Sequence, residues 1–215
     1  MVTVHGSGKP GEIASVFVAE VAKTFGSTWK TETLREFRYR LVNGYEKWNG
    51  QIMKLRFITV GGTIDKIYFD QLSEYQVGAP GVQRMLQDLP IAFEYTIESV
   101  LRKDSLDMTP EDRQQVRQAV ERCPEQFIVI THGTDTMIET ARLLIGIPGK
   151  RIVLTGAMQP ADFRHSDATF NVGMAIGVAV TQQSPGVWIT MSGQVFDPLK
   201  VRKNRARGMF ESTTT

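Results

Sequence analysis

The spacing of hydrophobic residues divides the chain into two parts that meet near Met53. In the first part, apolar residues recur every three or four positions over 14–25 and again over 34–48, as on one face of a helix. The second of these segments begins with the capping box Thr33–Glu36 and continues to Trp48. The pattern predicts a short helical N-terminal extension over residues 1–52, whose two amphipathic helices are too small to fold alone.

The second part alternates between short apolar runs and amphipathic segments. The runs predict strands at 55–60, 93–97, 127–130, 152–154 and 187–189. The intervening segments predict helices at 110–123, where Thr109 is the cap, at 136–146 and at 167–180. Strands that alternate with helices indicate one α/β domain over residues 53–215, with a mainly parallel sheet and right-handed crossovers.

Composition narrows the function classes. Hydrophobic residues make up 41% of the chain and charged residues 22%, which is typical of a globular protein. The net charge of +2 is too small to indicate a nucleic-acid partner, and no apolar run reaches the roughly 20 residues that span a membrane. The single cysteine, Cys123, and the scattered histidines lack metal-ligand spacing. We therefore expect a cytoplasmic protein without a metal or an organic cofactor.

Glycine-rich and polar residues follow three of the predicted strands. Gly61-Gly62-Thr63 follows the first, His132-Gly133-Thr134-Asp135 follows the strand at 127–130, and Gly156 follows the strand at 152–154. Because parallel α/β sheets bind ligands outside the carboxyl ends of their strands, we expect these loops to form one site. Glycines in such loops let backbone N–H groups approach a ligand oxygen, as in an oxyanion hole.

Each of these residues also has a purely structural interpretation. The glycine-rich loop after the first strand fits an ordinary tight turn, and Asp135 fits a helix cap. Lys150, just before the strand at 152–154, fits a solvated lysine, and His132 is interpreted as structural because it lies within a turn. Together, however, a threonine, a lysine and an aspartate are a workable substitute for Ser-His-Asp, since a desolvated lysine can act as a base.

Four segments resemble the N-terminal catalytic domain of the bacterial-type L-asparaginases. They are ITVGGTID (58–65), RKDSLDM (102–108), THGTDTMIETA (131–141) and KRIVLTGAMQPADFRHSDATFN (150–171). The resemblance implies a flavodoxin-like, three-layer α/β fold. It also implies hydrolysis of L-asparagine to L-aspartate and ammonia, through a threonine nucleophile and an acyl-enzyme.

The resemblance assigns catalytic roles within these segments. Thr63 matches the family's nucleophile, while Thr134, Asp135 and Lys150 match its second threonine, its aspartate and its lysine. The tyrosine that assists the nucleophile lies on the loop after Thr63. It matches either Tyr68 or Tyr75, and the shorter arc from Thr63 favours Tyr68.

Substrate binding is assigned to a second group of matching residues. Ser105 matches the serine that binds the α-carboxylate of the substrate, Gly133 is assigned to substrate binding as well, and Asp135 also holds the α-amino group. At the neighbouring substrate-binding position, Leu106 stands where larger members have a glutamine, so an amide contact is missing.

Larger members also have a second domain, which supplies an acidic residue to a neighbouring subunit's site. We interpret this chain as the short, single-domain branch of the family, and we expect a homo-oligomer that acts on a small amino-acid amide. Two alternatives remain. One is a glutamine-hydrolysing relative that supplies ammonia, and the other is a non-catalytic α/β module that binds an amino acid.

Overall fold

The computed structural model of the protein describes residues 47–48, 51–69, 74–87, 89 and 91–213. Two compact units share the chain, Met1–Met53 with Ala92–Glu94, and Lys54–Ile91 with Tyr95–Thr215. The helices predicted before residue 47 lie outside the described residues. The predicted continuation of the second helix to Trp48 is wrong, because β1 (Lys47–Trp48) and β2 (Gln51–Ile52) pair as antiparallel strands. Asn49-Gly50, between them, is a sequence that favours tight hairpin turns.

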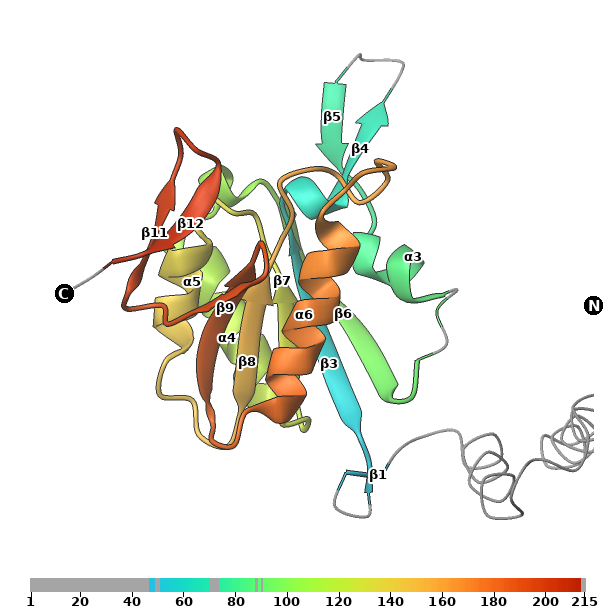
Figure 1. The fold of residues 1–215 in the computed structure, drawn as a ribbon, viewed down its shortest axis with the longest axis vertical. Helices are drawn as coiled ribbons and strands as arrows, with labels where there is room; N and C mark the ends of the chain where they lie inside the picture. The colour runs from blue at the N-terminus through green and yellow to red at the C-terminus, as the bar shows by residue number, and fades with distance from the viewer. Residues whose placement is uncertain (1–46, 49–50, 70–73, 88, 90, 214–215) are drawn as a thin grey trace, which may run out of the picture. The chain divides into compact units, whose positions relative to one another are not determined.

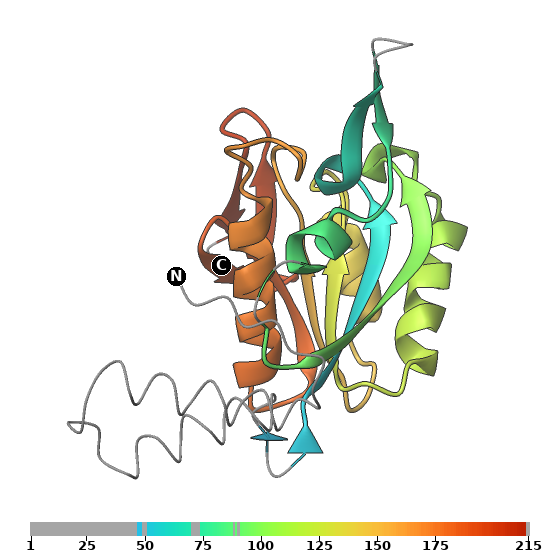
Figure 2. The ribbon, with the colours of Figure 1, turned by 90° about the vertical axis from the view of Figure 1, so that its right-hand side faces the viewer.

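A six-stranded sheet with the order β10-β9-β8-β7-β3-β6 organises the second unit (Figure 1). Its strands are β3 (Lys54–Gly61), β6 (Glu94–Lys103), β7 (Phe127–Thr131), β8 (Arg151–Thr155), β9 (Gly186–Met191) and β10 (Gln194–Phe196). Strands β3, β7, β8 and β9 pair in parallel, β10 is antiparallel to β9, and β6 runs in the same direction as β3 (Figure 2). Within this sheet, β3, the first strand in chain order, thus lies between the second, β6, and the third, β7. This flavodoxin-like order confirms the predicted fold class.

Helices α4 (Pro110–Arg122), α5 (Met137–Leu144) and α6 (Ala168–Thr181) link the parallel strands at the predicted places. A further short helix, α3 (Gly81–Gln87), was not predicted from the sequence. At the start of α4, Thr109 and Asp112 form a reciprocal capping box. Within the described residues, no helix combines the length and the hydropathy needed to cross a membrane.

The helices cover both faces of the sheet, α4 and α5 on one face and α3 and α6 on the other (Figure 2). Buried Ile130 and Leu154 pack in one cluster with Val116 of α4 and Leu144 of α5. Since side chains alternate along a strand, Val129 and its neighbours on β8 face α6 instead. The strands at the centre are therefore apolar on both faces, as the continuous apolar runs predict.

One connection between parallel strands has an unexpected hand. Strands β7, β8 and β9 follow one another across the sheet, so α5 and α6 would share a face if both connections were right-handed. They lie on opposite faces, and in Figure 1 α6 is in front of the sheet with β9 to the left of β8, which makes β8–α6–β9 left-handed. The prediction of right-handed crossovers is wrong here. The apolar second face of β7 and β8 gives a physical reason, because α6 covers it with small buried residues such as Ala175 and Ala179.

Two antiparallel hairpins complete the second unit, and neither was predicted from the sequence. The first, β4 (Lys66–Phe69) with β5 (Glu74–Val77), follows β3 and projects beyond the carboxyl ends of the strands (Figure 1). The second, β11 (Val201–Asn204) with β12 (Met209–Ser212), follows β10. Both hairpins contribute residues to the site described next.

Candidate active site

The candidate site lies where the strand order of the sheet reverses. Strands β3 and β7 are neighbours, but the chain leaves β3 toward β6 and leaves β7 toward β8. In sheets of this type, ligands bind in the crevice outside the carboxyl ends of such a strand pair. The turns at Gly62 and His132 begin at these two ends, where the sequence placed the site.

Two glycines let these turns touch through their backbones. Gly62 has a φ of 92°, and a Cβ atom added to it would lie 2.4 Å from both Cα and N of Gly133. A Cβ atom on Gly133 would lie 2.5 Å from Oγ of Ser105. A side chain at either position would push the loops apart. The glycines therefore bring together the segments that carry Thr63, Thr134 and Ser105.

Lys203 joins Thr134 and Asp135 into one polar group of side chains, here named the Thr134 cluster. Its Nζ atom donates a 2.8 Å hydrogen bond to Oγ1 of Thr134 and another of 2.8 Å to Oδ1 of Asp135. The lysine side chain is only 12% exposed, so this ion pair is poorly screened by solvent. Nε of Arg205, on a well-exposed side chain, lies 3.6 Å from the same carboxylate oxygen.

Lys150, which the sequence assigned to this cluster, lies elsewhere. It directly precedes β8, and its Nζ atom donates to the main-chain oxygens of Cys123 and Glu125, the latter at 2.9 Å. The amino end of β8 is at the edge of the sheet opposite the Thr134 cluster, so the assignment is wrong. Lys203, which lies on the β11–β12 hairpin 68 residues beyond Asp135, occupies the position that the sequence assigned to Lys150. No spacing in the sequence indicated this role for Lys203.

Ser105 lies directly beneath the contact between the two turns. It starts the short 3₁₀ helix η2 (Ser105–Asp107), is buried, and has no hydrogen-bond partner for its hydroxyl among the described residues. The adjoining Leu106 is 63% exposed. The substrate-binding roles of both residues stay predictions.

Tyr68 and Tyr75 occupy paired positions in the backbone of the β4–β5 hairpin. They are register partners of its antiparallel strands, and the Tyr68 side chain is 52% exposed. Because of this pairing, the hairpin carries both residues at the same distance from its base. The shorter chain length from Thr63 to Tyr68 thus does not discriminate between them, and the choice stays open.

His132 is structural, as predicted. It is fully buried, its Nδ1 lies 2.8 Å from the main-chain oxygen of Gly133, and its Nε2 lies 2.8 Å from Oγ1 of Thr140. The tautomer that satisfies both contacts has Nδ1 as donor and Nε2 as acceptor. Burial lowers the pKa of His132 to about 4, so the ring is neutral near pH 7. Both ring nitrogens are occupied in holding the turn.

A buried carboxylate that the sequence analysis missed lies two residues beyond Thr63. Asp65 ends the 3₁₀ helix η1 (Thr63–Asp65), is 2% exposed, and accepts a 2.7 Å hydrogen bond from the backbone N–H of Gly81. Burial raises the pKa of Asp65 to about 6, although the Gly81 hydrogen bond and the charges of Arg84 and Arg102 oppose this effect. The aspartate was visible in the motif Gly-Gly-Thr-Ile-Asp.

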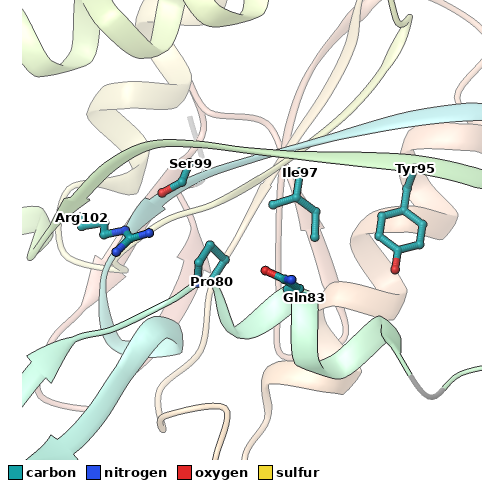
Figure 3. Close-up of a pocket in the computed structure, with 6 residues that line it drawn as sticks. All are labelled: Pro80, Gln83, Tyr95, Ile97, Ser99 and Arg102. Atoms are coloured by element: carbon teal, nitrogen blue, oxygen red, sulfur yellow. The ribbon is translucent and has the colours of Figure 1, made fainter.

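A hollow of about 360 Å³ lies apart from these residues, between α3 and β6 (Figure 3). Its lining consists of Pro80, Gln83, Tyr95, Ile97, Ser99 and Arg102. Neither Thr63 nor any member of the Thr134 cluster is among them, so this hollow is not part of the candidate active site. The described residues also gather no group of three His, Cys, Asp or Glu side chains that could hold a metal ion.

These features define a flavodoxin-like α/β domain with a hydroxyl–lysine–carboxylate site. Comparison with known proteins shows the family and the fold. A family model described as asparaginase, N-terminal, matches residues 54–214. The probable periplasmic L-asparaginase of Haemophilus influenzae is 30% identical over 159 residues, which are 69% of this chain and 46% of the relative. The glutaminase-asparaginase of Acinetobacter glutaminasificans is 33% identical over 116 residues, 52% of this chain and 34% of the relative.

A solved structure extends the likeness to three dimensions. The thermostable L-asparaginase from Thermococcus kodakarensis superposes with a TM-score of 0.65 at 28% identity, covering 74% of this chain and 51% of that one. The chain therefore belongs to the asparaginase family. It spans about a third to a half of the length of the relatives named here.

The two buried titratable groups predict an unusual pH dependence of stability. The pKa of His132 falls from 6.5 to about 4 on folding, so its contribution to stability is lost as the pH drops below 6.5. The pKa of Asp65 rises from 3.8 to about 6, so its contribution is present at low pH and is lost as the pH rises through 6. Each displacement corresponds to about 3 kcal/mol, and the two effects oppose each other between pH 4 and 6.

We expect Asp65→Asn to raise the free energy of unfolding at pH 7.5, because the variant buries no charge. The same variant should lose stability steeply below pH 6.5, where His132 alone remains, while the wild-type profile stays flatter. Denaturant unfolding of the full chain at several pH values measures this, with Asp107→Asn at an exposed site as control. Parallel profiles for wild type and Asp65→Asn would contradict the prediction.

Proposed function

We propose that the chain is an amidohydrolase that converts L-asparagine and water to L-aspartate and ammonia. The observation that carries this proposal is the Thr134 cluster, which lies at the strand-order reversal beside the Gly62–Thr63 turn. Membership of the asparaginase family and relatives named L-asparaginase support the reaction class.

In the first step, Oγ1 of Thr63 attacks the carbon of the side-chain amide and gives up its proton. Negative charge develops on the amide oxygen, where backbone N–H groups near Gly62 or Thr134 stabilise it. The C–N bond then breaks, the nitrogen gains a proton and leaves as ammonia, and an ester remains on Thr63.

In the second step, water cleaves this ester. Because Nζ of Lys203 donates to Oγ1 of Thr134, the hydroxyl proton of Thr134 points away from the lysine and toward a bound water or the leaving nitrogen. Asp135 holds the ammonium group of Lys203 in this position. The water attacks the ester carbon, its proton returns to the oxygen of Thr63, and L-aspartate is released.

The α-amino and α-carboxylate groups of the substrate need opposite partners. We assign the carboxylate to the unpaired hydroxyl of Ser105 and the ammonium group to Asp135, whose carboxylate is partly exposed. Leu106 offers no polar side-chain group for the substrate. The guanidinium of Arg205, beside Asp135, adds positive charge at the mouth of the site.

L-Glutamine is the second candidate substrate. A relative named glutaminase-asparaginase is 33% identical over 116 residues, so both amides belong in the assay. We further propose that the protein acts in the cytoplasm and that it is a homo-oligomer. The single, buried Cys123 supports the first of these, because it leaves no partner for a disulfide within the chain.

Replacement of the nucleophile is the first test. Thr63→Ala should lower kcat for ammonia release from L-asparagine by at least about 10³-fold, because the variant lacks the hydroxyl that forms the ester. Thr63→Ser keeps a hydroxyl and should keep measurable turnover. Ammonia release by the purified full chain, from L-asparagine and from L-glutamine, measures both variants.

Two outcomes of that assay would count against the proposal. Activity of Thr63→Ala within an order of magnitude of wild type would remove Thr63 from the nucleophile role. Absence of ammonia from both amides with the wild-type chain, together with measurable amino-acid binding, would favour a binding module.

The two candidate lysines make a matched pair of variants. Lys203→Met should lower kcat by about 10²–10³-fold, since it leaves Thr134 and Asp135 without their shared donor. Lys150→Met should leave kcat unchanged, because Lys150 bonds to the main-chain oxygens of Cys123 and Glu125 and to the Cys123 thiol, at the opposite edge of the sheet. Steady-state kinetics and melting temperatures of both variants show which lysine acts in catalysis and whether the variants remain folded. The reverse pattern would restore Lys150 to the site and overturn the role of Lys203.

The paired tyrosines are distinguished by removing one hydroxyl at a time. One of the variants Tyr68→Phe and Tyr75→Phe should lower kcat by about 10²-fold, as for the loss of a group that assists proton transfer, while the other changes it little. Since the two residues are register partners, each variant is the control for the other. Unchanged kcat in both variants would exclude the hairpin tyrosines from catalysis.

A further inference from the structure

Asp65 occupies a buried position in which an ionised carboxylate is energetically unfavourable. It lies two residues after Thr63, its side chain is 2% exposed, and its charge is disfavoured by burial. An asparagine would present the same acceptor oxygen to Gly81 without burying a charge. The cost suggests that the carboxylate does something that a neutral side chain does less well.

The bonds of Asp65 all lead to the segments that flank the β4–β5 hairpin. Its backbone N–H donates to the main-chain oxygen of Gly62 at 3.1 Å, and its own main-chain oxygen accepts from the N–H of Gly78 at 2.8 Å. Oδ1 accepts from the N–H of Gly81 at 2.7 Å. One residue therefore ties the turn that carries Thr63 to the chain on the far side of the hairpin.

The packing around this tie is close enough to require glycine. A Cβ atom on Gly81 would lie 2.8 Å from the main-chain oxygen of Ile64 and 2.9 Å from Cβ of Ala161. The main-chain oxygen of Ile64 also accepts from the N–H of Ala161 at 3.2 Å. The base of the hairpin is thus fixed on two sides, by α3 and by the loop that follows β8.

Charged groups surround Asp65 without forming an ion pair to it among the described residues. Arg84 of α3 and Arg102 of β6 favour its ionised form, and Arg84 is itself paired with Asp162 at 2.8 Å. The next residue, Lys66, is paired with Asp104 at 2.8 Å. The carboxylate is therefore stabilised mainly by its charge-assisted hydrogen bond with the N–H of Gly81. Such a bond is stronger than a hydrogen bond between neutral groups.

We propose that Asp65 is a positioning residue, whose buried carboxylate fixes the base of the β4–β5 hairpin to the Thr63 turn and so holds the hairpin over the reacting hydroxyl. The inference rests on the proposed function where it concerns catalysis. The order of the hairpin is a separate property that is measurable without any turnover.

Backbone hydrogen exchange of the full chain tests the order of the hairpin. Peptides covering 66–78 should exchange faster in Asp65→Ala than in wild type, while peptides covering β7 stay protected. Asp65→Asn, which keeps an acceptor, should fall between the two. Asp162→Ala removes the partner of Arg84 but not the Asp65–Gly81 bond, so it is the matched control and should exchange like wild type.

Kinetics of the same variants test the link to catalysis. Asp65→Ala should lower kcat by about 10- to 100-fold with a smaller change in KM, because misplacement of the reacting groups affects the transition state more than substrate binding. Asp65→Asn should recover most of kcat.

The outcomes separate the two proposals. Wild-type exchange of 66–78 in Asp65→Ala overturns the positioning role, and so does faster exchange that includes β7 equally, since that indicates a general loss of stability. If the wild-type chain releases no ammonia, the proposed function fails, and the exchange data still decide whether Asp65 orders the hairpin.

Discussion

The close backbone approach of Gly62 and Gly133 is the constraint on which the site depends. The parallel pairing of β3 and β7 brings two loops to one edge of the sheet, but loops with side chains at these positions would stand apart. With glycine at both, the backbones meet, and Gly133 also reaches the serine that follows β6. Three connections of the sheet thus converge, with the small side chain of Ser105 against Gly133.

Each charged group in the site has a specific structural or chemical role. Lys203 neutralises Asp135 and occupies one acceptor position of Thr134, which orients the proton of that hydroxyl. The neutral ring of His132 supports the turn from within, where a charge would be unfavourable. Asp65 is the exception, because its charge is buried without an ion pair to any of the described residues, and we therefore give it a functional explanation.

The sequence predicted those parts of the fold that depend on local pattern. Apolar runs identified the parallel strands, and the glycine-rich turns identified the edge that carries the site. Lys203 escaped detection because its contact with Thr134 joins segments far apart in the chain, through a hairpin whose strands are too short to show periodicity. The left-handed connection through α6 was not predicted for a related reason. The face of the sheet on which a helix packs depends on which helices already cover the opposite face.

The β11–β12 hairpin shows why the sheet alone does not make the site. The parallel strands, up to β9, supply the threonines and Asp135, but without Lys203 the carboxylate and the hydroxyl have no shared donor. The chain therefore has to continue past the last parallel strand and fold back toward β7. The family match, which extends to residue 214, includes this returning segment. The groups assigned to catalysis, from Thr63 to Lys203, thus all lie within the part of the chain that its relatives share.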